Sequence, residues 1–131
     1  MVKIILITHG NLGQALLETA SAICCVKGQN IESFTVSGKI NLEEIENKII
    51  SLCNKEQALI LVDTFGGTAC NIALKCALDR KDIFVICGLN LNMLLTAVNN
   101  NGKLPLNELS EKILQDGKKA IFEATEFVKK C

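Results

Sequence analysis

Four short apolar runs, each followed by a segment of helical periodicity, shape the whole sequence. The runs cover residues 2–8, 31–37, 58–64 and 83–88. The first and third runs are apolar almost throughout, which is typical of strands covered on both faces. Alternation of such strands with helices predicts an open, mostly parallel α/β sheet of four strands, with helices on both faces. The strand order that we expect is 2-1-3-4.

The predicted helices lie between and after these runs. Apolar residues recur at helical spacing over 12–23, and Asn41 is placed to cap a second helix, with Glu44 three residues later. Residues 68–78 and 93–98 also favour helix, and Pro105 opens a last one. The tail, 121–128, fits helix or strand equally well. Because 131 residues fit one core and no linker or repeat interrupts them, we expect one domain over 1–131.

Composition excludes two classes of function. The chain has 14 basic and 14 acidic side chains and no basic block with interleaved aromatic residues, which argues against nucleic-acid binding. No apolar stretch reaches the roughly 18 residues that span a bilayer. The opening run turns polar at Thr8 and His9, too early for a signal peptide. We therefore expect a cytoplasmic protein.

The seven cysteines are odd in number, and no two of them have C-x-x-C spacing. Zinc sites usually combine paired thiolates with histidine, and this chain has one histidine. Most of the cysteines lie in apolar runs, where cysteine behaves as a small buried hydrophobe. We expect no metal, no cofactor and no disulfide, and a reducing compartment.

Two polar segments follow predicted strands and are the candidate functional site. Residues 8–11 (Thr-His-Gly-Asn) follow the first strand, and residues 63–68 (Asp-Thr-Phe-Gly-Gly-Thr) follow the third. In open parallel sheets, ligands bind beyond the carboxyl ends of the strands where the strand order reverses. With the order 2-1-3-4, these two segments are neighbours in space.

The residue types in these segments suit transient phosphoryl transfer. A neutral imidazole, here His9, can attack phosphorus and pass the group onward. A carboxylate such as Asp63 can bind the far ring nitrogen, fix the tautomer and stabilise the cationic ring. Backbone N–H groups at helix N-termini can receive the phosphoryl oxygens. The predicted site therefore comprises His9, Asp63 and Thr68 as catalytic residues, and Gly10, Asn11, Gly66 and Gly67 as phosphoryl-binding residues.

Each of these residues also has an ordinary structural explanation. A histidine at a strand end is more often merely exposed, an aspartate can cap a turn, and two glycines can simply connect a strand to a helix. Their coincidence at two adjacent strand ends favours the functional interpretation.

These motifs resemble the mannose-type IIA components of the bacterial phosphoenolpyruvate-dependent sugar phosphotransferase system. The resemblance rests on the segments 8–10, 61–68 with Asn71, and 88–94. It implies that His9 is the phosphorylated histidine, that Asp63 orients it, and that Thr68 places a hydroxyl near the phosphoryl group. It also implies transfer from phospho-HPr to a IIB component, with IIC and IID membrane components downstream.

The resemblance further implies a homodimer that exchanges a C-terminal antiparallel strand, which would make 121–128 a strand. The chain lacks the Ala/Pro-rich hinge that precedes a fused IIB domain, so we expect IIB on a separate chain. Two family prolines are replaced, by Ala69 and Asn92. These replacements remove rigidity from the loops without removing a chemical group.

Other readings of the same residues are the phosphoryl carrier of dihydroxyacetone kinase and a non-catalytic regulatory or binding module. The former shares the fold and histidine but lacks the Phe65-Gly66-Gly67 pattern. A histidine phosphatase would need an arginine before His9 and a second histidine, and both are missing. Flavin binding lacks support because the chain has no Trp or Tyr, and neither nucleotide-binding glycine motif occurs. The sugar is not defined by the sequence.

Overall fold

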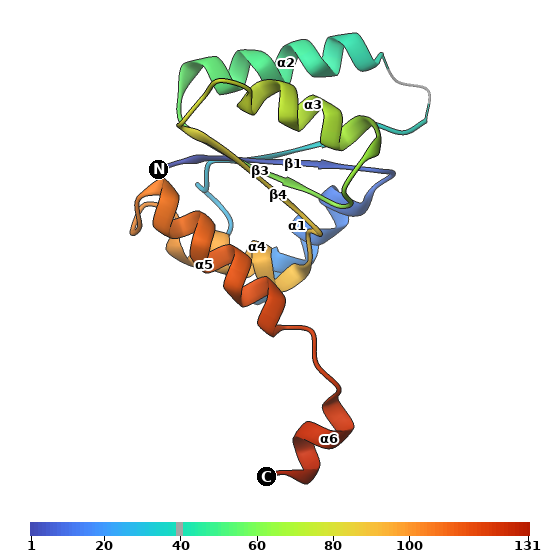
Figure 1. Ribbon diagram of the computed structural model, residues 1–131, viewed down its shortest axis with the longest axis vertical. Helices are drawn as coiled ribbons and strands as arrows, with labels where there is room; N and C mark the ends of the chain where they lie inside the picture. The colour runs from blue at the N-terminus through green and yellow to red at the C-terminus, as the bar shows by residue number, and fades with distance from the viewer. Residues whose placement is uncertain (39–40) are drawn as a thin grey trace.

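A computed structural model describes residues 1–38 and 41–131 as three layers, with a central sheet between two layers of helices (Figure 1). Helices α2 and α3 cover one face of the sheet, and α1, α4 and α5 cover the other. The strands are β1 (Lys3–Thr8), β2 (Ile31–Thr35), β3 (Ala58–Val62) and β4 (Ile83–Cys87). The helices are α1 (Leu12–Ile23), α2 (Leu42–Lys55), α3 (Gly67–Ala77), α4 (Leu91–Asn100), α5 (Leu106–Lys119) and α6 (Ala124–Lys129).

The sheet is parallel with strand order β2-β1-β3-β4, which confirms the predicted fold class and order. Near the end of β1, Ile7 pairs with Phe34 of β2 on one side and with Val62 of β3 on the other. The register therefore brings the carboxyl ends of β1 and β3 to the same edge, side by side. The segments that follow these two strands are the ones that hold the predicted site residues.

The two central strands are buried over their whole length, which explains why their sequences do not alternate with polar residues. Ile4 and Leu6 of β1 pack toward the α1, α4 and α5 layer. Ile5 and Ile7 point the opposite way and pack against the α2 and α3 layer. Because both faces of β1 and β3 are covered, these strands give the site a rigid base.

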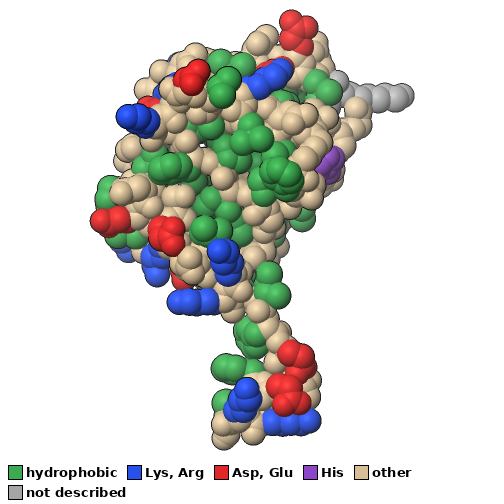
Figure 2. All heavy atoms as spheres, in the orientation of Figure 1, with side chains coloured by type: hydrophobic (Ala, Val, Ile, Leu, Met, Phe, Trp, Pro, Cys, Tyr) green, Lys and Arg blue, Asp and Glu red, His purple; other side chains and the backbone are tan. Residues whose placement is uncertain are grey.

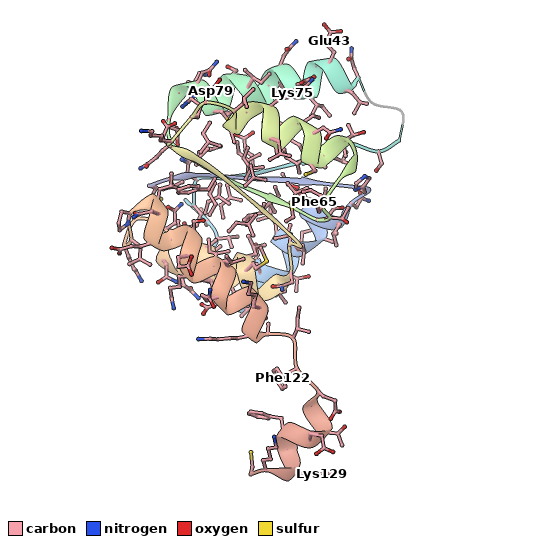
Figure 3. The ribbon with its side chains drawn as sticks, in the orientation of Figure 1. Glu43, Phe65, Lys75, Asp79, Phe122 and Lys129 are labelled. Carbon is pink, nitrogen blue, oxygen red and sulfur yellow. The ribbon has the colours of Figure 1, made fainter. Side chains whose placement is uncertain are left out.

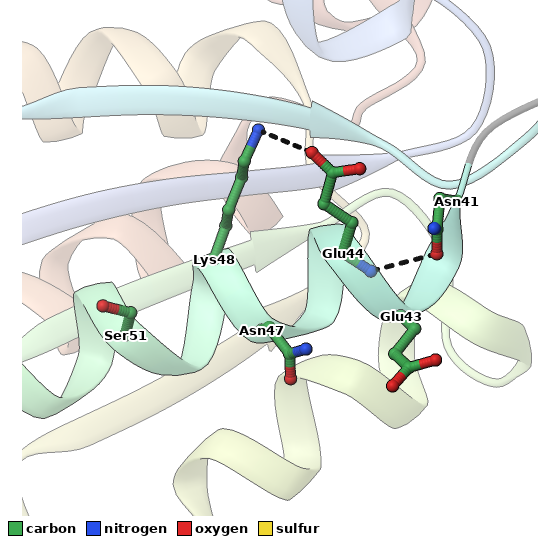
Figure 4. Close-up of a pocket in the computed structure, with 6 residues that line it drawn as sticks. All are labelled: Asn41, Glu43, Glu44, Asn47, Lys48 and Ser51. Carbon is green, nitrogen blue, oxygen red and sulfur yellow. Dashed lines mark hydrogen bonds and ion pairs between the residues drawn. The ribbon is translucent and has the colours of Figure 1, made fainter.

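Helix caps set the helix boundaries close to where the sequence predicts them. The Asn41 side chain accepts a hydrogen bond from the backbone N–H of Glu44, at 3.2 Å, and thereby caps α2 as predicted (Figure 4). Asn90 caps α4 in the same way through the N–H of Met93, at 2.9 Å. Since this cap precedes Leu91, α4 begins earlier than the predicted 93–98. Pro105 stands directly before α5, as expected.

The C-terminal segment differs from the strand implied by the family resemblance. Residues 121–123 lead away from the sheet to the short helix α6, which stands apart from the three layers (Figure 1). A strand needs a neighbouring strand for its backbone hydrogen bonds, whereas a helix supplies its own partners. The Glu123 carboxylate accepts from the N–H groups of Thr125 and Glu126, at 3.0 and 2.8 Å, and starts this helix. In the single chain the segment is therefore helical, and the exchanged strand, which needs a second copy, is not confirmed.

Within residues 1–38 and 41–131, no helix is both long and apolar enough to cross a membrane.

The cysteines are less uniformly buried than the sequence suggests. Three of them, Cys53, Cys70 and Cys76, are buried, while Cys25 and Cys131 are exposed and the other two are half-buried.

Candidate functional site

His9 and Asp63 form the centre of the site, at the adjacent ends of β1 and β3. One carboxylate oxygen of Asp63, Oδ2, lies 2.9 Å from the ring Nδ1 of His9 and 2.9 Å from the backbone nitrogen of His9. The other oxygen, Oδ1, accepts from the N–H of Thr64 at 2.9 Å. The His9 side chain is 46% exposed and that of Asp63 only 11%. The ring is therefore held from its inner side and open to solvent on its outer side.

This geometry determines which ring nitrogen can react. A carboxylate only accepts hydrogen bonds, so in the neutral ring Nδ1 of His9 carries the proton and Nε2 keeps its lone pair. Burial alone would raise the pKa of Asp63, but hydrogen bonds from the His9 backbone and ring and from Thr64 outweigh it, and the pKa is lowered. Asp63 is thus ionised at neutral pH and can stabilise positive charge that develops on the ring.

The turn after His9 leads directly into α1. Gly10 adopts φ of +54°, a left-handed conformation that glycine reaches without strain, and its N–H donates to the Ser37 hydroxyl. The Thr8 hydroxyl accepts from the N–H of Gly13 at 2.9 Å. Asn11 stands at the N-cap position of α1, but its side chain makes no capping hydrogen bond. The start of α1 is therefore organised by Thr8, which lies in the first predicted site segment, and by Ser37, which lies outside both segments.

The second predicted phosphoryl-binding element is the N-terminus of α3. Gly66 and Gly67 have φ of +86° and +76°, and a Cβ atom added at either position would meet only open space. Gly66 stands at the N-cap, with no side chain bonded to the first turn. The free N–H groups of a helix N-terminus are a favourable site for an anion. Thr68 lies in this first turn with its side chain exposed.

Phe65 is a further residue of the site that the sequence analysis did not single out for function. It lies between Asp63 and the two glycines and is 81% exposed, the highest value among the large apolar side chains of the described residues. Figure 3 shows it at the end of the sheet away from Asp79. Ser37 also belongs to this edge, since it follows β2 just as His9 follows β1. The rule that led to His9 and Asp63 could have identified Ser37 as well.

Other features of the described surface do not compete with this site. A hollow of about 490 Å³ lies along α2 and is lined by six polar or charged residues, none of them predicted for the site (Figure 4). Within the described part of the chain, no group of three or more His, Cys, Asp or Glu side chains is arranged to hold a metal ion.

Comparison of the sequence with known proteins identifies the family to which this chain is similar. Residues 3–114 match the family EIIA-man, described as "PTS system fructose IIA component". The chain is 31% identical over 122 residues to a sorbose-specific EIIA component of the phosphotransferase system from Klebsiella pneumoniae, covering 86% of this chain and 84% of that protein. It is 26% identical to a mannose-specific EIIAB component from Escherichia coli, covering 92% of this chain but only 38% of that longer protein.

Solved structures agree with the fold. A mannose/sorbose-specific IIA subunit from Enterococcus faecalis superposes with a TM-score of 0.76 at 25% identity, over 93% of each chain. An EIIA component from Streptococcus agalactiae superposes with a TM-score of 0.85 at 22% identity, over 96% of this chain and 99% of that one. The family match spans the sheet, both site segments and most of α5. The chain belongs to the mannose-type IIA family, whose members are components of the bacterial sugar phosphotransferase system.

Proposed function

We propose that this chain, as one domain over 1–131, carries a phosphoryl group on Nε2 of His9 between phospho-HPr and a IIB component on a separate chain. The observation that carries the proposal is the double hydrogen bond from His9 to Asp63 Oδ2. It leaves Nε2 as the ring nitrogen with a free lone pair on the exposed side. The IIB component would then pass the group to a sugar imported through the IIC and IID membrane components, with this chain in the cytoplasm.

The proposed reaction is an in-line displacement at phosphorus. Nε2 of His9 attacks the phosphoryl group of phosphohistidine HPr, and the N–P bond to the HPr histidine breaks as the new bond forms. The His9 ring becomes cationic, and the ionised Asp63 beside Nδ1 stabilises that charge. Onward transfer to IIB reverses these roles, with His9 as the leaving group.

The phosphoryl oxygens need donors that are already in place. The N-terminus of α3, with Gly66 and Gly67 in open left-handed conformations, is suited to supply backbone N–H groups, and Thr68 can add a hydroxyl. Gly10 and Asn11 at the start of α1 are suited to the same role from the other side of His9. The N–H of Gly10 donates to Ser37 in the unphosphorylated chain, so a phosphoryl oxygen would have to replace that partner.

The proposal includes a homodimer. Four large apolar side chains of the C-terminal segment are exposed, and Figure 2 shows green apolar side chains on this segment among charged ones. These residues are Ile121, Phe122, Phe127 and Val128. A second copy of the chain would remove them from water. Light scattering on the full chain, compared with a variant carrying Phe122→Ser and Phe127→Ser, tests this part by the loss of the dimer.

The central experiment is a phosphorylation assay read by intact mass. The chain is incubated with HPr, Enzyme I and phosphoenolpyruvate, beside His9→Ala and His9→Gln. We expect one acid-labile phosphoryl group on the wild type and none on either variant. The Gln variant is the better matched control, because its amide can still donate a hydrogen bond to Asp63. If wild-type mass does not change while HPr is phosphorylated, the carrier function is wrong.

A further inference from the structure

Four of the seven cysteines lie in one layer of the molecule, between the sheet and the helices α2 and α3. They form two pairs. Cys70 of α3 and Cys87 of β4 have their sulfur atoms 4.0 Å apart, and Cys53 of α2 and Cys76 of α3 line one cavity. The second pair lies near the C-terminal ends of both helices, whereas His9 and Asp63 lie near the N-terminus of α3.

Cys87 lines a cavity without Cys70, whereas Cys53 and Cys76 share a cavity with two cationic side chains. The cavity has a volume of about 220 Å³, and its lining includes both cysteines together with Lys75 and Arg80. The Arg80 guanidinium donates to the backbone carbonyl of Cys53 at 3.0 Å and is held by Asp82 at 2.8 Å. A cation fixed beside a thiol favours its thiolate form. A cavity of this size admits a small oxidant.

We propose that Cys53 and Cys76 are a reversible oxidation site, which a hydroperoxide converts to a disulfide. This site is separate from the phosphoryl site in position and in chemistry, so the proposal does not depend on the proposed carrier function.

The two thiols are inequivalent in a way that suits this reaction. Interaction with the Cys53 thiol lowers the pKa of Cys76, with a smaller contribution from Arg80 and opposing contributions from burial and Glu46. Interaction with Cys76, together with burial, raises the pKa of Cys53. Cys76 is also the more accessible residue, 8% exposed against 1% for Cys53, so it is the nucleophile, and Cys53 holds its proton until the first step is complete.

The reaction balances with a hydroperoxide as the oxidant. The Cys76 thiolate attacks the outer peroxide oxygen, the O–O bond breaks, and the products are a Cys76 sulfenic acid and an alkoxide or hydroxide. That base takes the Cys53 proton, which the neutral sulfenic acid no longer helps to retain. The Cys53 thiolate then attacks the sulfenic sulfur, and the disulfide forms as hydroxide leaves and is protonated to water. A dithiol reductant restores both thiols.

Peptide mapping distinguishes the two cysteine pairs, because trypsin places each of the four cysteines on a different peptide. Cys53 falls in 49–55, Cys70 in 56–75, Cys76 in 76–80 and Cys87 in 82–103. After treatment of the folded chain with hydrogen peroxide and alkylation of the remaining thiols, we expect a link between 49–55 and 76–80. The intact chain should lose about 2 Da, and dithiothreitol should reverse this loss.

Variants test the assigned roles. Cys76→Ala should abolish the link, whereas Cys53→Ala should leave a Cys76 sulfenic acid that dimedone traps. Cys70→Ala is the matched control and should leave the link unchanged, and circular dichroism verifies that each variant is folded. Arg80→Gln should slow the reaction about threefold if the guanidinium favours the thiolate. A chain that stays fully reduced, or one linked only between 56–75 and 82–103, would overturn the proposal.

Discussion

A single oxygen atom of Asp63 receives both the backbone N–H and the ring Nδ1 of His9, each at 2.9 Å. The backbone hydrogen bond fixes the position of the His9 main chain, and the ring hydrogen bond fixes the rotation and the tautomer of the imidazole. One oxygen atom of Asp63 therefore determines both the position of His9 and the state of its ring. Replacing Asp63 affects the position of the main chain and the chemistry of the ring together.

We predict that Asp63→Asn slows phosphoryl transfer by roughly 100-fold, because an amide oxygen carries no full charge to stabilise the cationic ring. The rate is measured by rapid-quench transfer from phospho-HPr. Asp82→Asn, at the far end of α3, is the control and should transfer at the wild-type rate. Equal rates for Asp63→Asn and the wild type would contradict the role of the carboxylate.

Stability in acid should also depend on Asp63. Its pKa in the folded chain lies below the unfolded value, near 3.8, so its hydrogen bonds stabilise the fold above that pH. This contribution declines as the pH falls through the folded pKa. In urea titrations, the difference in unfolding free energy between wild type and Asp63→Asn should stay constant above about pH 5 and shrink as the pH falls below that value. A difference that is independent of pH would exclude this linkage.

The Thr68 hydroxyl should matter to transfer but not to folding. The Thr68 side chain is exposed in the first turn of α3, where its hydroxyl could donate a hydrogen bond to a phosphoryl oxygen. We predict that Thr68→Ala lowers the transfer rate about tenfold, and that Thr68→Ser restores most of it, with unchanged thermal midpoints. An alanine variant as active as the wild type would remove Thr68 from the site.

The conformation of Gly67 gives a test that separates stability from function. An alanine there is strained by about 1 kcal/mol at φ of +76°, although no atom lies close enough to clash. Gly28 has φ of +83° and equally open surroundings, so Gly28→Ala is a matched control. We expect both variants to lose similar stability in urea, but only Gly67→Ala to lose transfer activity. Equal activities would show that the α3 N-terminus does not bind the phosphoryl group.

We expect Phe65 to contribute to the binding of a protein partner. A ring that is 81% exposed beside the reactive histidine adds apolar contact area at little conformational cost. We predict that Phe65→Ala raises the KM for phospho-HPr about tenfold and leaves the maximal rate unchanged. Leu78→Ala, which removes a side chain that is 72% exposed at the other end of α3, should change neither. A change confined to the maximal rate would instead place Phe65 in the chemical step.

The sequence was sufficient to predict the parts of the molecule that follow from local rules. Continuous apolar runs predict β1 and β3, and the predicted strand order places His9 beside Asp63, where the structure has it. Ser37 was missed because the predicted strand over 31–37 included it, whereas β2 ends at Thr35 and Ser37 follows it. The conformation of the tail could not be predicted, because residues 121–128 form a helix or a strand depending on which part of the protein lies next to them. Their own periodicity does not contain that information.

The reactive edge is supplied by the two innermost strands, and this has a consequence for hydrogen exchange. Amides of β1 and β3 are bonded on both sides within fully buried layers, so they exchange only when most of the sheet opens. His9 and Asp63 each follow directly after one of these strands. The separation between their backbones therefore fluctuates little short of global unfolding. Any conformational change needed for a protein to dock on this edge is therefore expected in the partner and in exposed side chains such as Phe65, and not in the backbone of the site.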